Sequence, residues 1–206
     1  MIERGRSTKG RVARALTGAD AIEIKVTVPQ HQVKPALKRF GLTVDNDEQR
    51  YIYFFDTPSL DLMNAGVIVR ARRVVGGAHD ATVKFRPVVP EKVSRKWAKY
   101  RDFKIEADAS EKGLAKSASF SMPVASGLIK RVAAGKRSIR KLFTPVQQAF
   151  LQEMTGRAID FSKLAVLGPI TAHRWRIETP ACPWPISAEL WRREDGALLV
   201  EASITS

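Results

Sequence analysis

The chain has 206 residues, of which 44% are hydrophobic and 27% are charged. This composition is typical of a folded globular protein and excludes overall disorder. A single cysteine, Cys182, excludes an intramolecular disulfide and a cysteine-built metal site, and no apolar run is long enough to predict a transmembrane helix.

Charge is the unusual property of the sequence. Thirty-five Lys and Arg against 21 Asp and Glu give a net charge of +14, which favours polyanionic partners such as nucleic acid, anionic membranes or phosphate-rich small molecules. Residues 1–19 predict a basic flexible tail, because the first 18 residues contain five cations and one acid without a strand pattern. The tail accounts for +4, so the remaining +10 belongs to residues 20–206, which we expect to form one domain.

Strand patterns dominate the first half of this domain. Residues 21–28 alternate strictly between apolar and polar side chains and are bounded by Pro29, as expected of a β-strand. A short helix is expected at 32–40, ended by Gly41. Further strands are predicted at 51–55, 67–75, 81–86 and 101–109.

The middle of the chain is predicted as a helical insert over about 111–166. Within it, residues 126–152 contain six cations and no acid, and the apolar spacing over 128–143 predicts an amphipathic helix with a basic face. That face is either solvated surface or a binding site for an acidic partner, nucleic acid included. Strands return at 172–178, 186–192 and 198–204.

The predicted fold is therefore mainly β, an α+β protein with an eight-stranded antiparallel barrel and flanking helices. Most of the strands place Arg, Lys or Glu at alternate positions. If these faces point outward, the chain is a sandwich with a highly charged surface. If they point inward, they line a water-filled bore, in which charges must be paired, hydrated or bound to ions.

Several motifs resemble the CYTH superfamily of triphosphate tunnel metalloenzymes, over residues 20–205. Ala21-Ile-Glu-Ile-Lys25 is similar to the Glu-x-Glu-x-Lys signature, and Tyr53-Phe-Phe-Asp-Thr57 with Arg70-x-Arg72 resembles the most specific block of that family. The later motifs follow in the family's order: Thr82-x-Lys84, Lys104-x-Glu106-x-Asp108, Arg174-x-Arg176, Glu189 and Glu201.

The resemblance implies an eight-stranded tunnel that binds a triphosphate together with Mg²⁺ or Mn²⁺. By position, the implied phosphate-binding residues are Lys25, Arg70, Arg72, Lys84, Arg174 and Arg176. The implied metal ligands are Glu23, Glu106, Asp108, Glu189 and Glu201, and Lys25 and Glu106 are the implied catalytic residues. Guanidinium groups suit phosphate because they can donate to two oxygens at once, and carboxylates suit Mg²⁺.

Two departures from the family pattern concern the metal. Ala21 stands where the first signature glutamate is expected, and Ser203 stands where a second acid is expected after Glu201. Fewer carboxylates weaken divalent-metal binding, so these two residues affect the predicted reaction more than the predicted fold.

Several functions therefore remain open. The leading expectation is metal-dependent hydrolysis of tripolyphosphate, ATP or thiamine triphosphate. The alternatives are a triphosphate-binding protein without turnover, an adenylate cyclase making cAMP from ATP, and a nucleic-acid-binding module using the tail and residues 128–143. His173 and the four tryptophans are expected to be structural, and the lack of a signal sequence and of disulfides favours the cytoplasm.

Overall fold

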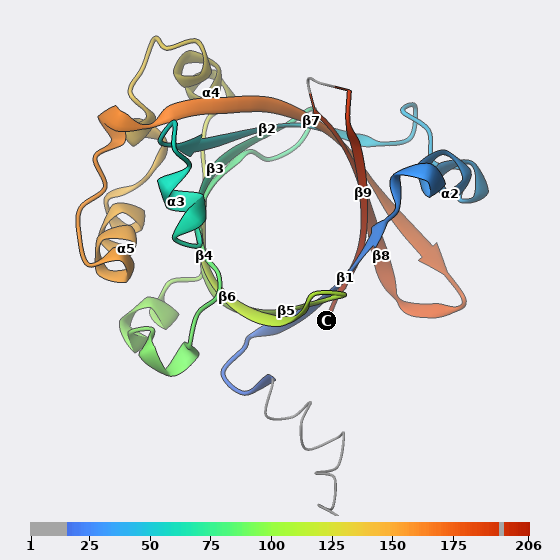
Figure 1. Cartoon of the computed structure of the whole chain (residues 1–206), viewed down its shortest axis with the longest axis horizontal. Helices are drawn as coiled ribbons and strands as arrows, with labels where there is room; N and C mark the ends of the chain where they lie inside the picture. Colours follow the sequence, from blue (N-terminus) through green and yellow to red (C-terminus); the bar gives the residue numbers. More distant parts are fainter. Residues whose placement is uncertain (1–15, 194–195) are drawn as a thin grey trace, which may run out of the picture.

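The computed structural model describes residues 16–193 and 196–206, and in this part of the chain nine strands close into a barrel (Figure 1). The strands are β1 (Ala21–Val28), β2 (Glu48–Asp56), β3 (Val67–Val74), β4 (Asp80–Phe85), β5 (Phe103–Ser110), β6 (Gly113–Pro123), β7 (Ala165–Thr179), β8 (Cys182–Arg192) and β9 (Leu198–Thr205). Their order around the barrel is β1-β5-β6-β4-β3-β2-β7-β8-β9, and β9 pairs with β1. The neighbours are antiparallel except for β1 and β5, which run parallel.

The predicted number of eight antiparallel strands is therefore wrong by one strand and by this one parallel pair. The additional strand is β6, which lies in the range predicted to begin the helical insert at 111. Its signal is present in the sequence, because Ser117, Ser119 and Ser121 alternate with apolar residues at a period of two. The alternating polar side chains are small and uncharged, so this pattern lacks the charges that mark the other strands of the barrel.

Helices cover parts of the outer face of the barrel. They are α2 (Val33–Arg39), α3 (Asp61–Asn64), α4 (Ser126–Ala133) and α5 (Pro145–Thr155), with short 3₁₀ helices at Gln30–Gln32, Pro90–Lys92, Arg95–Lys99, Ile139–Leu142 and Phe161–Lys163. The amphipathic helix predicted over 128–143 is interrupted, because Gly135 adopts a φ of +69° after the end of α4. Helix α5 begins with a capping box at Thr144 and ends at Gly156, which adopts a left-handed conformation.

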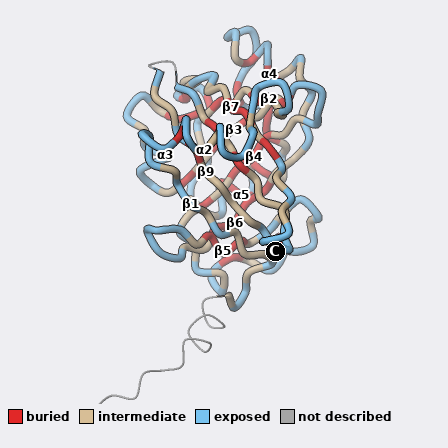
Figure 2. Tube along the Cα trace, turned by 90° about the vertical axis from the view of Figure 1, so that its right-hand side faces the viewer, coloured by how far each residue is buried: buried red, intermediate tan, exposed pale blue. Residues whose placement is uncertain are grey.

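The hydrophobic core lies outside the barrel, between the strands and these helices. Phe120 on β6 and Phe150 on α5 are 1% and 0% exposed, and their ring centroids are 6.0 Å apart. Figure 2 shows that buried segments concentrate in the barrel wall and in the parts of the helices that face it. Because apolar side chains occupy the outward positions of the strands, the alternating polar side chains point into the bore.

The predicted tail falls mainly on residues 1–15, which lie outside the described residues. Residues that follow them contact the barrel, since Lys116 Nζ donates to the Thr17 carbonyl (2.6 Å) and Ile105 N–H donates to Asp20 (2.7 Å). None of the helices in the described part of the chain combines the length and apolar character needed to cross a membrane.

A buried glutamine joins α5 to the barrel and provides a test of this packing. Gln147 Nε2 donates to the carbonyls of Ala81 (2.8 Å) and Phe120 (3.0 Å), on β4 and β6. Replacing Gln147 by Ala removes both bonds and should lower the free energy of unfolding by about 2 kcal/mol, the range found for unsatisfied buried groups. Urea unfolding measures this loss, and Gln152→Ala, an exposed change on the same helix, is the matched control. Equal stability of the two variants would contradict the described packing.

Candidate functional site

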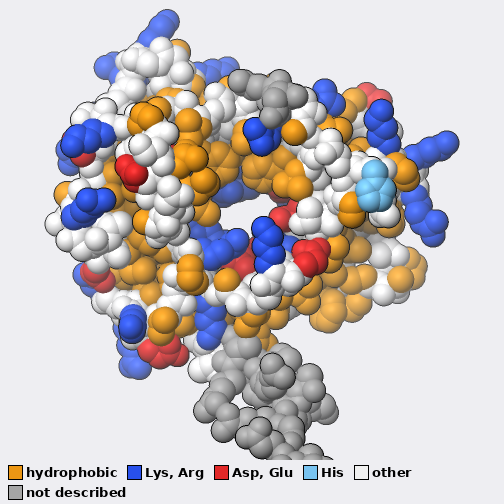
Figure 3. All heavy atoms as spheres, viewed as in Figure 1, with side chains coloured by type: hydrophobic (Ala, Val, Ile, Leu, Met, Phe, Trp, Pro, Cys, Tyr) orange, Lys and Arg blue, Asp and Glu red, His pale blue; other side chains and the backbone are white. Residues whose placement is uncertain are grey.

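The bore of the barrel is a polar, open cavity of about 380 Å³. Its volume falls in the range typical of small-molecule sites. Figure 3 looks through the opening and shows charged side chains along one side and hydrophobic side chains along the other. Seven cations line it: Lys25, Arg50, Arg70, Arg72, Lys84, Lys104 and Arg174. Among the described residues, four acids line it with them, namely Glu23, Glu106, Glu189 and Glu201, which leaves a formal surplus of three positive charges.

One row of charges crosses three neighbouring strands. Arg174 on β7, Glu189 on β8 and Glu201 on β9 are direct cross-strand partners, so their side chains lie next to one another on the inner wall. Arg50 Nη1 donates to Glu189 Oε1 at 2.6 Å, and Arg174 Nε lies 4.0 Å from the same oxygen. Glu189 is thus held between two guanidinium groups.

Lys25 on β1 is held by two carboxylates. Its Nζ donates to Glu201 Oε1 at 3.0 Å and lies 3.3 Å from Glu23 Oε2. Burial lowers the pKa of Lys25, but the two carboxylates outweigh this effect, so the net pKa is raised above the ordinary value. Lys25 is therefore a stable cation.

Lys84 on β4 and Glu106 on β5 form the opposite wall, with Asp108 beside them. Lys84 Nζ lies 3.4 Å from Glu106 and 3.7 Å from Asp108, while Lys104 donates to Glu106 at 2.6 Å. Burial raises the pKa of Glu106, but Lys104 and Lys84 overcome this and lower it below the ordinary value. For Lys84, burial is the largest effect and lowers the pKa despite the two acids. The two lysines of the site therefore differ, because Lys84 loses its charge at lower pH than Lys25.

The arginines of β2 and β3 are incompletely compensated. Arg72 donates to Asp80 at 2.7 Å, but Arg70 approaches Asp80 only to 3.9 Å, and the buried Nε of Arg70 has no hydrogen-bond partner among the described residues. Burial, followed by the repulsion of Arg72, lowers the pKa of Arg70. Burial, followed by the repulsion of Arg72, lowers the pKa of Arg50 as well. An anion between these side chains would relieve the repulsion between the guanidinium groups and accept a hydrogen bond from the unused Nε–H of Arg70.

Nine of the predicted site residues come together in this cavity. They are Glu23, Lys25, Arg70, Arg72, Lys84, Glu106, Arg174, Glu189 and Glu201. Asp108 lies beside the cavity, bound to Arg86 (2.7 Å) and Ser117 (2.8 Å). The structure does not bring Arg176 into the site, because its side chain is 65% exposed and pairs with Glu178. The roles predicted for these residues in binding and catalysis stay predictions.

Two cavity-lining cations were missing from the predicted site. Arg50 was overlooked because the strand was predicted to begin at Tyr51, whereas β2 begins at Glu48. Extending the alternation of this strand back from Ile52 would have placed Arg50 on the same face of the strand as Ile52. Lys104 was recognised in its motif but given no role.

The most specific family motif has a structural role in part. The buried carboxylate of Asp56 accepts hydrogen bonds from the backbone N–H groups of Thr57, Leu62 and Met63, at 2.7–2.9 Å. Its interactions hold α3 at the end of β2. His173 is structural as well, since its Nδ1 is 2.5 Å from Asp47 and its ring stacks on Trp175.

The acids fit a divalent metal only in combination with other ligands. Among residues 16–193 and 196–206, no group of three or more His, Cys, Asp or Glu side chains lies close enough to hold a metal ion. The expected ligands come from β1, β5, β8 and β9 and already pair with cations. Glu189 and Glu201, however, are direct neighbours, and Mg²⁺ is commonly bound by one or two carboxylates plus substrate phosphates. The donor set therefore suits an ion that binds with a phosphate ligand.

The two departures from the family motif lie at this site. Ser203 lines the cavity as the cross-strand partner of Lys25, and Ala21 is the partner of Glu106 in the parallel β1–β5 pair. Neither position supplies a carboxylate.

Comparisons with known proteins give a structural likeness. No family model matches the chain, and no curated protein matches it by sequence. A candidate adenylate cyclase from Bacillus halodurans has a TM-score of 0.58 at 15% identity, covering 89% of this chain and 79% of that one. A protein from Hippeastrum, described as a candidate adenylyl cyclase with a dominant triphosphatase activity, has a TM-score of 0.58 at 17% identity, covering 89% and 78%. This chain shares the fold of these two proteins. The mainly β barrel with flanking helices that the sequence predicted is confirmed, with nine strands in the described residues instead of eight.

Arg70, whose buried Nε has no partner among the described residues, gives the first prediction for the site. Arg70→Gln should leave the stability of the free protein unchanged or raise it, because it removes a buried charge that Arg72 repels. The same change should weaken binding of tripolyphosphate about tenfold or more, since it removes a charged donor. Thermal unfolding and isothermal titration calorimetry measure the two effects.

The neighbouring arginine provides the control. Arg73 faces the other side of β3 and lies over the Tyr51 ring, with its guanidinium carbon 4.2 Å from the centroid. Arg73→Gln should leave tripolyphosphate binding unchanged. If both variants bind tripolyphosphate like the wild type, Arg70 has no part in anion binding.

The lowered pKa of Lys84 predicts how binding depends on pH. Only the protonated amine attracts an anion, so affinity for tripolyphosphate should fall as pH rises through a value below the ordinary lysine pKa of 10.5. Lys84→Arg should move this fall to higher pH, because guanidinium remains protonated there. Titrations between pH 7 and 10 check the prediction, which an identical pH profile for the two proteins would contradict.

Proposed function

We propose that the tunnel binds the triphosphate group of a small molecule and hydrolyses a phosphoanhydride bond with the help of Mg²⁺ or Mn²⁺. The observation that carries this proposal is the cluster of Arg50, Arg70 and Arg72, whose charges repel one another and of which Arg70 retains an unused buried donor. A triphosphate carries several negative charges along a short chain, which matches cations arranged on both sides of a bore.

The chain's own residues would have separate roles in such a reaction. Lys25, Arg50, Arg70, Arg72, Lys84, Lys104 and Arg174 line the cavity and would hold phosphate oxygens in place. Positioning and charge compensation supply most of the catalysis of phosphoryl transfer, because the transition state places charge on these oxygens. Glu106, kept ionised by Lys104 and Lys84, would accept a hydrogen bond from the attacking water.

The metal completes the compensation of charge. Glu189 and Glu201 are the residues that would hold it, as adjacent carboxylates on β8 and β9. When bound, a divalent ion neutralises phosphate charge and polarises the phosphoryl group. The triphosphatase activity named for the Hippeastrum protein, which shares the fold, supports this type of reaction.

A binding protein without turnover is the second candidate, and a specific observation favours it. Ala21 and Ser203 leave the site with fewer carboxylates, and those that remain pair with Lys or Arg. The tunnel would then hold a triphosphate through its cations alone. Adenylate cyclase chemistry would use the same tunnel with ATP, and its product, cAMP, distinguishes it from hydrolysis.

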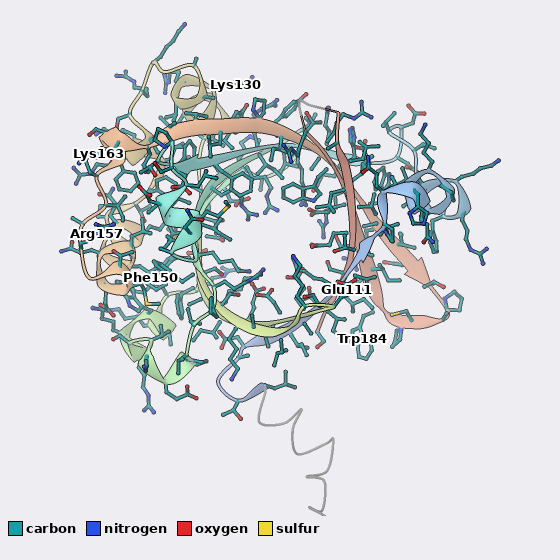
Figure 4. The ribbon with its side chains drawn as sticks, viewed as in Figure 1. Glu111, Lys130, Phe150, Arg157, Lys163 and Trp184 are labelled. Carbon is teal, nitrogen blue, oxygen red and sulfur yellow. The ribbon has the colours of Figure 1, made fainter. Side chains whose placement is uncertain are left out.

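The basic residues of the helix predicted over 128–143 lie outside the tunnel. Lys130, Arg131, Lys136, Arg137, Arg140 and Lys141 are all exposed on the outer side of the barrel, and Figure 4 shows Lys130 there. Binding of nucleic acid by this surface would be independent of the tunnel and would weaken steeply with salt.

Phosphate release from tripolyphosphate, ATP and thiamine triphosphate, each with Mg²⁺ and with Mn²⁺, tests the proposal. We expect turnover of at least one of these compounds and its loss, by at least a hundredfold, in Lys25→Ala and Glu106→Ala, because each contributes to positioning and charge compensation. Arg176→Ala is the matched control, since Arg176 shares the strand of Arg174 but lies outside the cavity, and it should retain activity.

Two negative outcomes have different meanings. Thermal stabilisation by tripolyphosphate without phosphate release would contradict hydrolysis and identify a binding protein. The absence of both stabilisation and phosphate release would contradict triphosphate recognition altogether.

A further inference from the structure

Part of the inner wall of the tunnel is apolar. Arg50, Ala172, Trp191 and Leu199 are successive cross-strand partners on β2, β7, β8 and β9, so they form one row of the inner wall. In the adjacent row, Arg72 is followed by Ile52 and Ile170. Hydrophobic side chains along one side of the opening are visible in Figure 3. The arginine cluster therefore borders an apolar wall in which Trp191 has the largest side chain.

Trp191 differs from the other tryptophans of the chain. Trp97 and Trp175 are 3% and 4% exposed, and their indole N–H groups donate to Glu153 and to the Thr43 carbonyl. Trp184 is 50% exposed and lies outside the barrel on the β7–β8 hairpin (Figure 4). Trp191 is partly exposed within the cavity itself. In the described part of the chain, its ring stacks on no aromatic side chain and its N–H has no hydrogen-bond partner.

The position of Trp191 suits the non-phosphate part of a ligand. Trp191 lies two residues beyond Glu189 on β8, which corresponds to about 7 Å along the strand. In a triphosphate ester, the organic group is attached directly to the first phosphate. With the phosphates between the arginines and lysines, this group would lie beside Trp191, where its ring could stack on the indole.

We propose that Trp191 recognises an aromatic heterocycle, and that the tunnel therefore prefers organic triphosphates carrying such a ring, for example nucleoside triphosphates, over inorganic tripolyphosphate. This inference rests on the proposed triphosphate binding and adds the class of substrate. Tripolyphosphate has no apolar part and gains nothing from a wall of Trp191, Ile170 and Leu199. Every nucleobase has a π-face that can stack on an aromatic side chain, so stacking selects a ring without distinguishing one base from another.

Isothermal titration of ATP and of tripolyphosphate into the wild type, Trp191→Ala, Trp191→Phe and Trp184→Ala tests this inference. We expect Trp191→Ala to weaken ATP binding about tenfold, within the range for loss of one stacking interaction, and to change tripolyphosphate binding less than twofold. Trp191→Phe should retain most of the affinity for ATP. Trp184→Ala, which removes a tryptophan outside the barrel, should bind both compounds like the wild type.

Fluorescence adds a readout that a structural role would not change. ATP should quench the emission of the wild type more than that of Trp191→Phe, whereas tripolyphosphate should produce no such difference. Equal losses for ATP and tripolyphosphate in Trp191→Ala, or no loss for either, would overturn the inference while leaving triphosphate binding intact. If the wild type binds neither compound, the proposed function fails as well.

Discussion

The structure depends on charge compensation inside a closed barrel. The strands place apolar side chains outward against the helices and charged side chains inward, so the bore concentrates groups that are costly to remove from water. Such an arrangement is stable only when each charge has a partner, is hydrated or binds an ion. The acids of the bore meet this requirement through ion pairs, whereas Arg70 on β3 does not meet it completely.

The two departures from the family motif, Ala21 and Ser203, both make the net charge of the bore more positive. Carboxylates at positions 21 and 203 would add two negative charges near Glu106 and Lys25, reducing the surplus of three positive charges to one. With Ala21 and Ser203, the tunnel attracts an anion more strongly and a divalent cation less strongly. The same two residues thus favour triphosphate binding and make the metal more dependent on the phosphates that arrive with it.

Much of the fold and the site could be predicted from the sequence, and the reasons for the exceptions are physical. The alternation in β1, β3 and β5 placed their charged side chains on one face of each strand, and the resemblance to the CYTH motifs implied that these faces line a tunnel. Strand β6 was missed because its inward side chains are serines, which line the bore without a charge. Arg50 was missed because the strand was predicted to begin at Tyr51, and Trp191 was interpreted as a structural residue; the pairing of β2, β7 and β8 shows that the two share one inner row.

Residue roles were harder to predict than residue positions. Arg176 follows the same alternation as Arg174, but β7 extends beyond the cavity, so the second arginine is exposed. Asp108 shares the inward face of Glu106 and yet is bound by Arg86 and Ser117 beside the cavity. The alternation shows which face a side chain takes, whereas the length of the strand beyond the barrel and the neighbouring cations determine whether the side chain reaches the ligand.

We infer that the surplus of positive charge in the bore forms a binding site for a chain of phosphates. Thermal unfolding of the wild type in orthophosphate, pyrophosphate and tripolyphosphate at equal ionic strength, with a chelator present, tests it most directly. The account predicts stabilisation that increases with the number of phosphates at equal anion concentration, because a longer chain reaches more of the seven cations. Equal stabilisation by all three anions, or none by tripolyphosphate, would contradict it.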